Sequence, residues 1–196
     1  MINKTQKQEL VKRAEYHHKM DNIIKGTYWT SEGKGCCVGC LAQCAINVHQ
    51  ELENKFGVPV WLGYLADTLF EGLPAEKNKD FVVRFAKALP QGKSLKLVRP
   101  KFLLSTLQNL PKDYKKFPDC KKAIERVIAL LIKESKGKVV DNKTWVSARS
   151  AAESARSARS AAESARSAAW SAESAAWSAA YVKMADELIR LLEAVK

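Results

Sequence analysis

Four cysteines fall within nine residues in the first quarter of the sequence, and their thiols could bind a metal or act in catalysis. They are Cys36, Cys37, Cys40 and Cys44, with a fifth, Cys120, far along the chain. Cys37 and Cys40 have one of the spacings that zinc sites use. A second ligand pair at a diagnostic spacing is missing, although His17, His18 and His49 are available. We therefore expect structural thiols without a metal or cofactor, with zinc binding and redox chemistry as the alternatives.

A glycine-containing turn, Gly33-Lys34-Gly35, precedes the cysteines and offers a different chemistry. Backbone N–H groups at the start of a helix favour an anion such as phosphate. Lys25 and Lys34 would add positive charge, and Tyr28 or Trp29 would stack on a base. The candidate ligand-binding residues here are Lys25, Tyr28, Trp29, Lys34 and Gly35. The turn has neither P-loop nor dinucleotide-binding spacing, so a plain tight turn between helices is the alternative.

The charge of the chain is positive and unevenly distributed. Its 196 residues include 33 Lys and Arg against 21 Asp and Glu, a net charge of +12. Residues 1–140 hold 25 basic and 14 acidic side chains, a net +11, whereas residues 141–196 are nearly neutral at +1. Such a basic region fits a polyanionic partner: nucleic acid, a nucleotide or an acidic protein surface.

Cysteine usage and hydropathy bear on where the protein works. Five cysteines, an odd number with four of them in nine residues, favour reduced thiols in a cytoplasm over a disulfide framework. The sequence has no apolar run of about 18 residues and no charged-then-apolar leader. We therefore expect a cytoplasmic protein that neither spans a membrane nor carries a standard secretion signal.

Helices must position these residues, because apolar side chains recur at spacings of three and four without clear period-two alternation. Predicted helices cover about 5–24, 38–56, 59–72, 81–89, 100–107 and 123–134. A capping box of Thr5 and Gln8 is predicted to open the first helix. The fold class is all-α, with a basic helical domain at 1–140 followed by one long helix at 141–196.

That C-terminal helix is rich in Ala and Ser and contains no Gly or Pro. Its larger residues recur at three or four positions, an average of about 3.5, which is close to a coiled-coil heptad. Within the stripe, Arg149, Arg156, Arg159 and Arg166 form either a solvated face paired with Glu or contacts for an anionic partner. The aromatic and aliphatic residues that follow need a covering surface. We therefore expect packing or oligomerisation through this helix, most simply as a homo-oligomer.

Three segments resemble an uncharacterised family of bacterial and phage-encoded proteins. They are Gly35-Cys36-Cys37-Val38-Gly39-Cys40, Phe70-Glu71-Gly72-Leu73-Pro74, and the Ser/Ala/Arg/Trp tail ending in Ala179-Ala180-Tyr181-Val182-Lys183-Met184-Ala185-Asp186. No activity is assigned to that family, so no catalytic residues carry over. The resemblance implies a cytoplasmic accessory protein, acting in the host cytoplasm if phage-encoded, where it could interfere with host defence.

Together these patterns predict a non-enzymatic protein that captures a phosphate-bearing ligand, either a nucleotide or nucleic acid, or an acidic host protein. In a phage it could sequester a signalling nucleotide or inhibit a defence complex. The alternative is a structural oligomerisation module built on the long C-terminal helix. An enzyme is not expected, because no nucleophile–base pair or carboxylate set has a diagnostic spacing.

Overall fold

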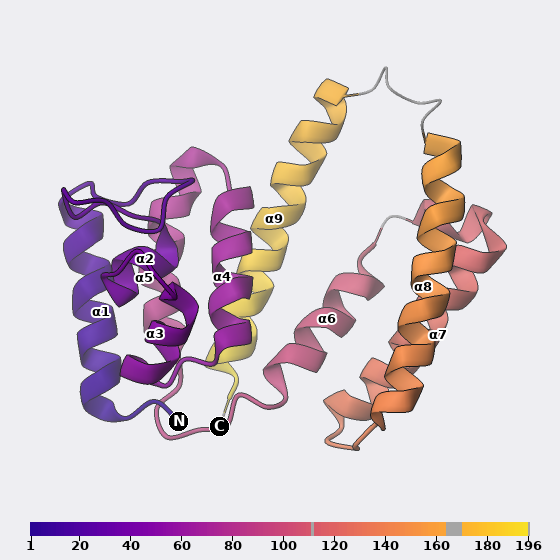
Figure 1. Ribbon diagram of the computed structural model, residues 1–196, viewed down its shortest axis with the longest axis horizontal. Helices are drawn as coiled ribbons and strands as arrows, with labels where there is room; N and C mark the ends of the chain where they lie inside the picture. The colour runs from indigo at the N-terminus through magenta and orange to yellow at the C-terminus, as the bar shows by residue number, and fades with distance from the viewer. Residues whose placement is uncertain (111, 164–169, 196) are drawn as a thin grey trace. The chain divides into compact units, whose positions relative to one another are not determined.

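The protein is helical throughout the part of the chain that the structure describes (Figure 1). This computed structural model describes residues 1–110, 112–163 and 170–195, with only the main chain at 112, 113, 152, 154–163 and 170–177. Within these ranges there is no strand, and one isolated bridge joins Ile23 to Gly35. The predicted all-α class is therefore confirmed. The chain divides into two compact units: unit 1 is Met1–Leu95 with Ala175–Lys196, and unit 2 is Lys96–Ser174.

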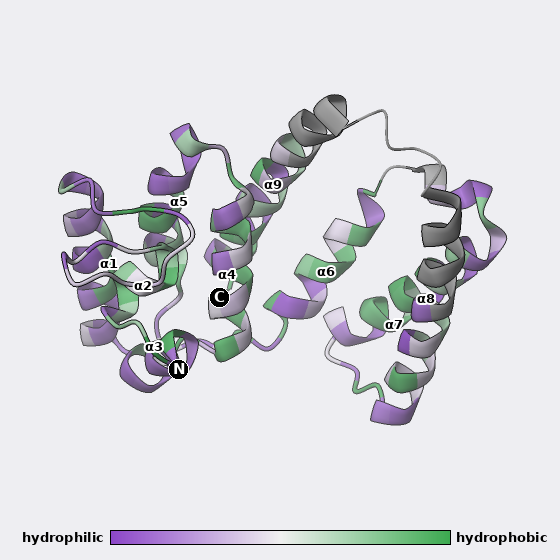
Figure 2. Ribbon diagram, turned by 45° about the horizontal axis from the view of Figure 1, so that its top comes forward, coloured by the Kyte–Doolittle hydropathy of each residue, from purple (hydrophilic) through white to green (hydrophobic). Residues whose placement is uncertain are grey.

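Unit 1 is a cluster of helices around a buried apolar core. Its helices are α1 (Lys4–Lys19), α2 (Cys37–Ala42), α3 (Val48–Phe56), α4 (Val60–Gly72), α5 (Ala75–Ala88) and most of α9 (Trp170–Glu193). Helix α1 packs on α2, α3 and α5, and α4 packs on the same three helices. Phe70, Phe81 and Phe85 are the largest side chains buried among them. In Figure 2 the outward side of α1 is hydrophilic, as expected of an amphipathic helix.

Helix α1 begins with a capping box, but not the predicted one. Asn3 Oδ1 accepts a hydrogen bond from the Gln6 N–H at 2.8 Å, and Gln6 Oε1 accepts one from the Asn3 N–H at 2.9 Å. The predicted box of Thr5 and Gln8 is wrong, because Thr5 already lies inside the helix. The observed box satisfies the N–H groups of Asn3 and Gln6, and its cap residue lies two residues before the predicted cap Thr5.

The segment predicted as one helix at 38–56 is two helices, α2 and α3, with a break between them. Gln43 follows α2 with a φ of 54°, and Asn47 precedes α3 with a φ of 51°. Both values lie in the left-handed region, which ends a right-handed helix. The apolar spacing continues across the break because both helices face the same core: Leu41, Val48 and Leu52 are all buried.

Helix α9 supplies the last part of the unit 1 core. Leu188 and Leu192 are fully buried, as are most of their apolar neighbours on the same face. On α4, Gly72 leaves room for the ring of Tyr181, whose atoms would lie within 2.4 Å of a Cβ at that position. On α5, Arg84 forms an ion pair with Asp186 at 2.8 Å. The aliphatic end of the predicted long helix is therefore covered by its own chain.

Unit 2 is a smaller helical assembly with a Lys-rich surface. It contains α6 (Val98–Gln108), the 3₁₀ turn η1 (Lys112–Lys116), α7 (Pro118–Ser135) and α8 (Asn142–Glu163). Helix α7 is central, because α6, η1 and α8 all pack against it. Pro118 stands in the first turn of α7, where its missing N–H costs no hydrogen bond. The stretch between the predicted helices 100–107 and 123–134 is thus partly helical.

The segment predicted as one C-terminal helix, 141–196, is divided between the two units. The structure describes it as α8 and α9, and residues 164–169 between them lie outside the described residues. The boundary of the units falls at Ser174 and Ala175, within α9. The two compact units therefore divide the chain differently from the expected division at residue 140. Among the helices in the described ranges, none has the length and apolar character needed to cross a lipid bilayer.

Candidate functional site

The turn before α2 is held by its own backbone hydrogen bonds. The N–H groups of Gly33 and Lys34 donate to the main-chain and side-chain oxygens of Thr30. The Gly35 N–H donates to the Asn22 carbonyl at 3.0 Å, and the Cys36 N–H donates to the Thr27 carbonyl at 2.8 Å. These four N–H donors of the turn are therefore committed within the chain.

The other residues predicted in this turn have structural contacts as well. Lys25 donates through its Nζ to the carbonyl of Glu71 at 2.9 Å and to that of Leu73. These carbonyls lie at the end of α4, where a cation satisfies orphan acceptors and the helix dipole. Lys34 pairs loosely with the neighbouring Glu32 at 3.5 Å. Trp29 packs its ring edge-on against His17, with 5.4 Å between the centroids.

Two glycines let the backbone of Tyr28 lie against α2. A Cβ at Gly35 would lie 2.1 Å from the Tyr28 carbonyl oxygen, and one at Gly39 would lie 1.5 Å from it. Both distances are far below van der Waals contact, so only glycine fits. The Tyr28 ring then meets the edge of His49 at 5.5 Å. This close approach fixes the start of α2 and, with it, the thiol of Cys36.

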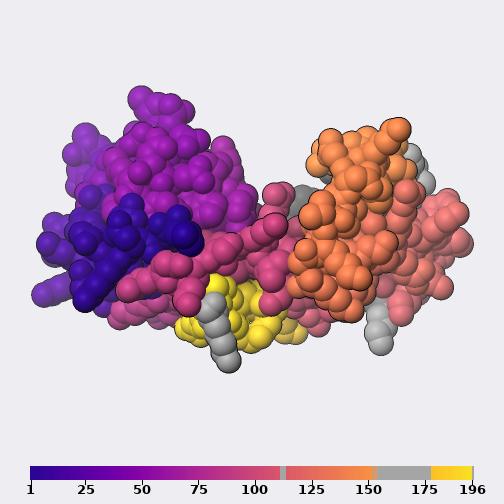
Figure 3. All heavy atoms as spheres, turned by 90° about the horizontal axis from the view of Figure 1, so that it is seen from below, coloured from indigo at the N-terminus to yellow at the C-terminus, as the bar shows by residue number. Residues whose placement is uncertain are grey.

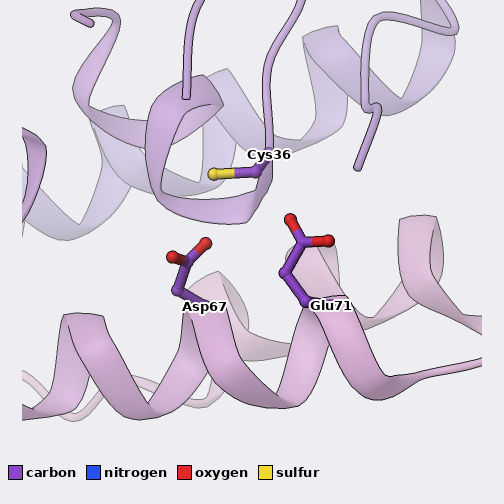
Figure 4. Close-up of side chains that lie close together, drawn as sticks. All are labelled: Cys36, Asp67 and Glu71. Carbon is purple, nitrogen blue, oxygen red and sulfur yellow. The ribbon is translucent and has the colours of Figure 1, made fainter. Parts of the chain in front are cut away.

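Cys36 faces two carboxylates from α4 (Figure 4). Its Sγ and one oxygen each from Asp67 and Glu71 all lie within 4.8 Å of one another. Asp67 and Glu71 are one helical turn apart, so their side chains leave α4 on the same side. Cys36 is buried, Asp67 is half-buried and Glu71 is exposed. Burial raises the pKa of the Cys36 thiol, and the carboxylate of Asp67 adds to that rise.

A buried imidazole stands behind Asp67. His49 is 6% exposed, and its Nε2 has no hydrogen-bond partner. That nitrogen lies 3.7 Å from Asp67 Oδ2, which is too long for a hydrogen bond. The ring is stacked on Tyr64 at 3.8 Å between centroids, so its direction is fixed. Asp67 Oδ1 is also buried without a partner.

Cys37 and Cys40 do not belong to the cluster of Cys36, Asp67 and Glu71. Cys37 is completely buried, and Cys40 donates its thiol to the Gly35 carbonyl at 3.2 Å. Burial raises the pKa of Cys40 to about 12. Within the described ranges, the Cys37 and Cys40 pair does not join a group of three possible metal ligands. The pair Cys37 and Cys40, whose spacing suggested zinc, is therefore not part of the cluster of Cys36, Asp67 and Glu71.

The positive charge of the chain belongs mainly to unit 2. Residues 96–174 contain 17 basic and 8 acidic side chains, a net charge of +9. Residues 1–95 and 175–196 contain 16 basic and 13 acidic side chains, a net charge of +3. Every basic side chain of unit 2 that the structure describes is exposed. Helices α7 and α8 of this unit pack side by side, and their atoms adjoin in Figure 3.

Three basic side chains share one face of α7, and the exposed Asp119 lies on that face in the first turn of the helix. Lys122, Arg126 and Lys133 follow at intervals of four and seven residues, so they share a face on the side away from the buried residues Cys120 and Leu131. We call these three residues the basic face of α7. Arg126 also donates to Ser147 Oγ on α8 at 3.0 Å. Of the arginines predicted on the long helix, Arg149 is exposed on α8. The side chains of Arg156 and Arg159, and all of Arg166, lie outside the described residues.

Sequence reasoning did not select the carboxylates beside Cys36. The available signal was the i,i+4 spacing of Asp67 and Glu71 on the predicted helix 59–72. That spacing is common on solvated helix faces, so it names no partner. His49 was considered as a ligand, but its neighbour Asp67 lies 18 positions away in the sequence.

Comparisons were made with family models, with curated proteins and with solved structures. None of the three finds a match to this chain.

Proposed function

We propose that this chain is a non-enzymatic protein that binds nucleic acid through the phosphate backbone, using the surface of unit 2. The observation that supports the proposal is the net charge of +9 on residues 96–174. Duplex nucleic acid carries dense negative charge, and Lys and Arg bind it by releasing condensed counterions. The basic face of α7 offers three such side chains along one line.

A polyanion fits this protein better than a single nucleotide held by the turn at Gly33–Gly35. The N–H donors of that turn already bond to Thr30, Asn22 and Thr27. The Lys25 ammonium is bonded to main-chain carbonyls. The exposed Lys and Arg side chains of unit 2 are spread over several helices, as expected of a surface that follows a charged backbone.

The test is the salt dependence of binding to a labelled DNA duplex, followed by fluorescence anisotropy. Wild-type protein should bind tightly at low salt and lose affinity steeply as salt rises. The variant K122Q/K133Q/K136Q removes three exposed lysines but keeps the bond from Arg126 to α8. The slope of log K against log salt should fall by about one for each phosphate contact removed, so by about three in total.

The matched control is K4Q/K12Q/K19Q, which makes the same charge change on exposed lysines of α1 in unit 1. It should keep the wild-type slope. An equal loss in both triple variants would mean that net charge, and not unit 2, determines binding. Absence of binding to duplex and single-stranded DNA at low salt, with binding to polyglutamate, would replace nucleic acid by an acidic protein partner.

A further inference from the structure

Cys36, Asp67 and Glu71 form a set of possible metal ligands at the start of α2. Three potential ligand atoms, one sulfur and two carboxylate oxygens, lie within 4.8 Å of one another. Figure 4 shows the sulfur and both carboxyl groups turned into the same space between α4 and the start of α2. Two carboxylates one turn apart on a helix repel each other unless a cation lies between them. The nearby ammonium of Lys25 is bonded to main-chain carbonyls, not to these carboxylates.

An independent observation, the unsatisfied imidazole of His49, points to a ligand at this place. Its ring is 94% buried, and its Nε2 is directed at Asp67 from 3.7 Å without a hydrogen bond. Leaving a buried polar group unpaired is unfavourable. Asp67 Oδ1, on the other side of the same carboxylate, is likewise buried and unpaired. A cation bound by Oδ1 would let Oδ2 close on the imidazole and satisfy both groups.

We propose that Cys36, Asp67 and Glu71 bind one divalent transition-metal ion, with His49 as the positioning residue for Asp67. Zinc is the ion that this donor set favours, because it accepts thiolate and carboxylate ligands together in a tetrahedral site. Three protein ligands leave the fourth position to water. On binding, the Cys36 S–H bond breaks, its proton leaves to solvent, and a metal–sulfur bond forms.

The geometry requires a small contraction of the cluster. Bond lengths of about 2.0–2.3 Å put neighbouring ligands of a tetrahedral zinc about 3.3–3.6 Å apart. Cys36 is held by the close contact of Tyr28 with Gly35 and Gly39, so the two carboxylates make the adjustment. Glu71 can do so because it is exposed, although its carboxylate accepts a hydrogen bond from the Gly26 N–H at 3.0 Å. Because Glu71 is exposed, an ion can reach this ligand directly from solvent.

This inference stands apart from the proposed function. The cluster belongs to unit 1, whereas the basic surface belongs to unit 2. Either one can fail in experiment without affecting the other.

The experiment is a cobalt(II) titration of the full chain after treatment with a chelator. Cobalt replaces zinc in such sites, and a cobalt–thiolate bond gives a charge-transfer absorption band in the near ultraviolet. We expect the band to saturate at one cobalt per chain and to disappear when one equivalent of zinc is added. C36S should lose the band. C40S should keep it, because the Cys40 thiol donates a hydrogen bond to the Gly35 carbonyl and lies outside the cluster.

Two further variants keep the test decisive if C36S does not fold. E71Q changes an exposed side chain by one atom and should weaken cobalt binding at least tenfold while circular dichroism stays unchanged. H49Q should keep the thiolate band and weaken binding about 10–100-fold, as loss of a residue that orients a ligand does. The proposal is overturned if wild type shows no thiolate band at stoichiometric cobalt. A band that survives in folded C36S, or wild-type affinity in E71Q, would overturn it as well.

Discussion

His17 is a buried imidazole whose surroundings hold it neutral. It is 2% exposed, and its Nε2 lies 3.2 Å from the Gln43 side-chain amide. Its Nδ1 has no hydrogen-bond partner. Burial lowers the pKa of His17, and the positive charge of Arg13, one turn earlier on α1, lowers it further. Protonation of this ring in the folded protein is therefore unfavourable.

This predicts that the stability of unit 1 falls in mild acid. The folded-state pKa of His17 lies below its unfolded value of about 6.5, so the unfolded chain binds the proton first as pH decreases. The His17 contribution is complete above about pH 6.5 and is lost as pH falls toward the lowered pKa. Urea unfolding at about pH 7.5 and about pH 5.5 measures it.

H17Q should show a smaller difference in free energy of unfolding between the two pH values. H18Q alters an exposed neighbour and leaves the His17 contribution in place. If H17Q keeps the full wild-type pH dependence, other groups cause the acid sensitivity.

At the scale of single residues, the sequence identified the cysteines as notable but not the one beside the carboxylates. Cys36 lacks the Cys-x2-Cys spacing, and its neighbours Asp67 and Glu71 lie 31 and 35 residues later in the sequence. Tertiary packing creates this proximity, and local spacing carries no trace of it. The anion-binding role expected of Lys25 rested on its charge, whereas its contacts are to the end of α4.

At the scale of elements, α2 depends on the two glycines under Tyr28. Gly39→Ala would place a methyl group 1.5 Å from a main-chain oxygen, and a backbone cannot move aside as a side chain can. We expect a loss of about 3 kcal/mol or more in the free energy of unfolding, the upper range for overpacking. Urea denaturation followed by circular dichroism measures it.

Gly63→Ala is the matched control, because Gly63 is also a buried helical glycine. There the nearest atom to a new Cβ is the His49 Cδ2 at 3.2 Å, so the cost should be clearly smaller. Equal stability of G39A and wild type would mean that the Tyr28 segment does not need its close contact with α2.

Helix content was largely predictable, and helix boundaries were less so. Periodicity located α4 and α5, and Pro59 with Gly72 marked the ends of α4 well. Periodicity could not detect the break between α2 and α3. Two polar residues with left-handed backbones, Gln43 and Asn47, make that break while the apolar register continues. Such a conformation depends on packing more than on residue type.

At the scale of the whole molecule, the sequence located the positive charge only coarsely. It assigned a net +11 to residues 1–140, whereas the division into units assigns +9 to residues 96–174. Residues 1–95 carry only +3 of that charge, residues 96–140 carry +8, and residues 141–174 add +1 to unit 2. Helix α9 packs into a core whose other residues lie within 1–95. The local sequence pattern of α9 cannot show that it packs against residues so far away in the sequence.

Self-association through the C-terminal helix stays a prediction, but fewer residues of that helix are available to form the interface. Leu188 and Leu192 are covered within unit 1, so a second copy would have to pair on the Ala/Ser-rich part before them. We expect a dimer or larger oligomer by light scattering, and dissociation in A161E/A165E/A168E with helicity retained, since Glu is a good helix former. Those three side chains lie outside the described residues. A monomer at high micromolar concentration would contradict this.

The return of α9 to unit 1 has a consequence for synthesis on the ribosome. Helices α1 to α5 emerge first, but α9, which packs on α4 at Gly72 and pairs with α5 at Arg84, emerges after the 79 residues of unit 2. At about 5–20 residues per second, translation of that insertion takes about 4–16 seconds. Throughout this interval the nascent chain exposes the apolar surface that Leu188 and Leu192 will cover. Unit 1 is therefore open to chaperones and proteases while unit 2 is being made, and it closes only when α9 has left the ribosome.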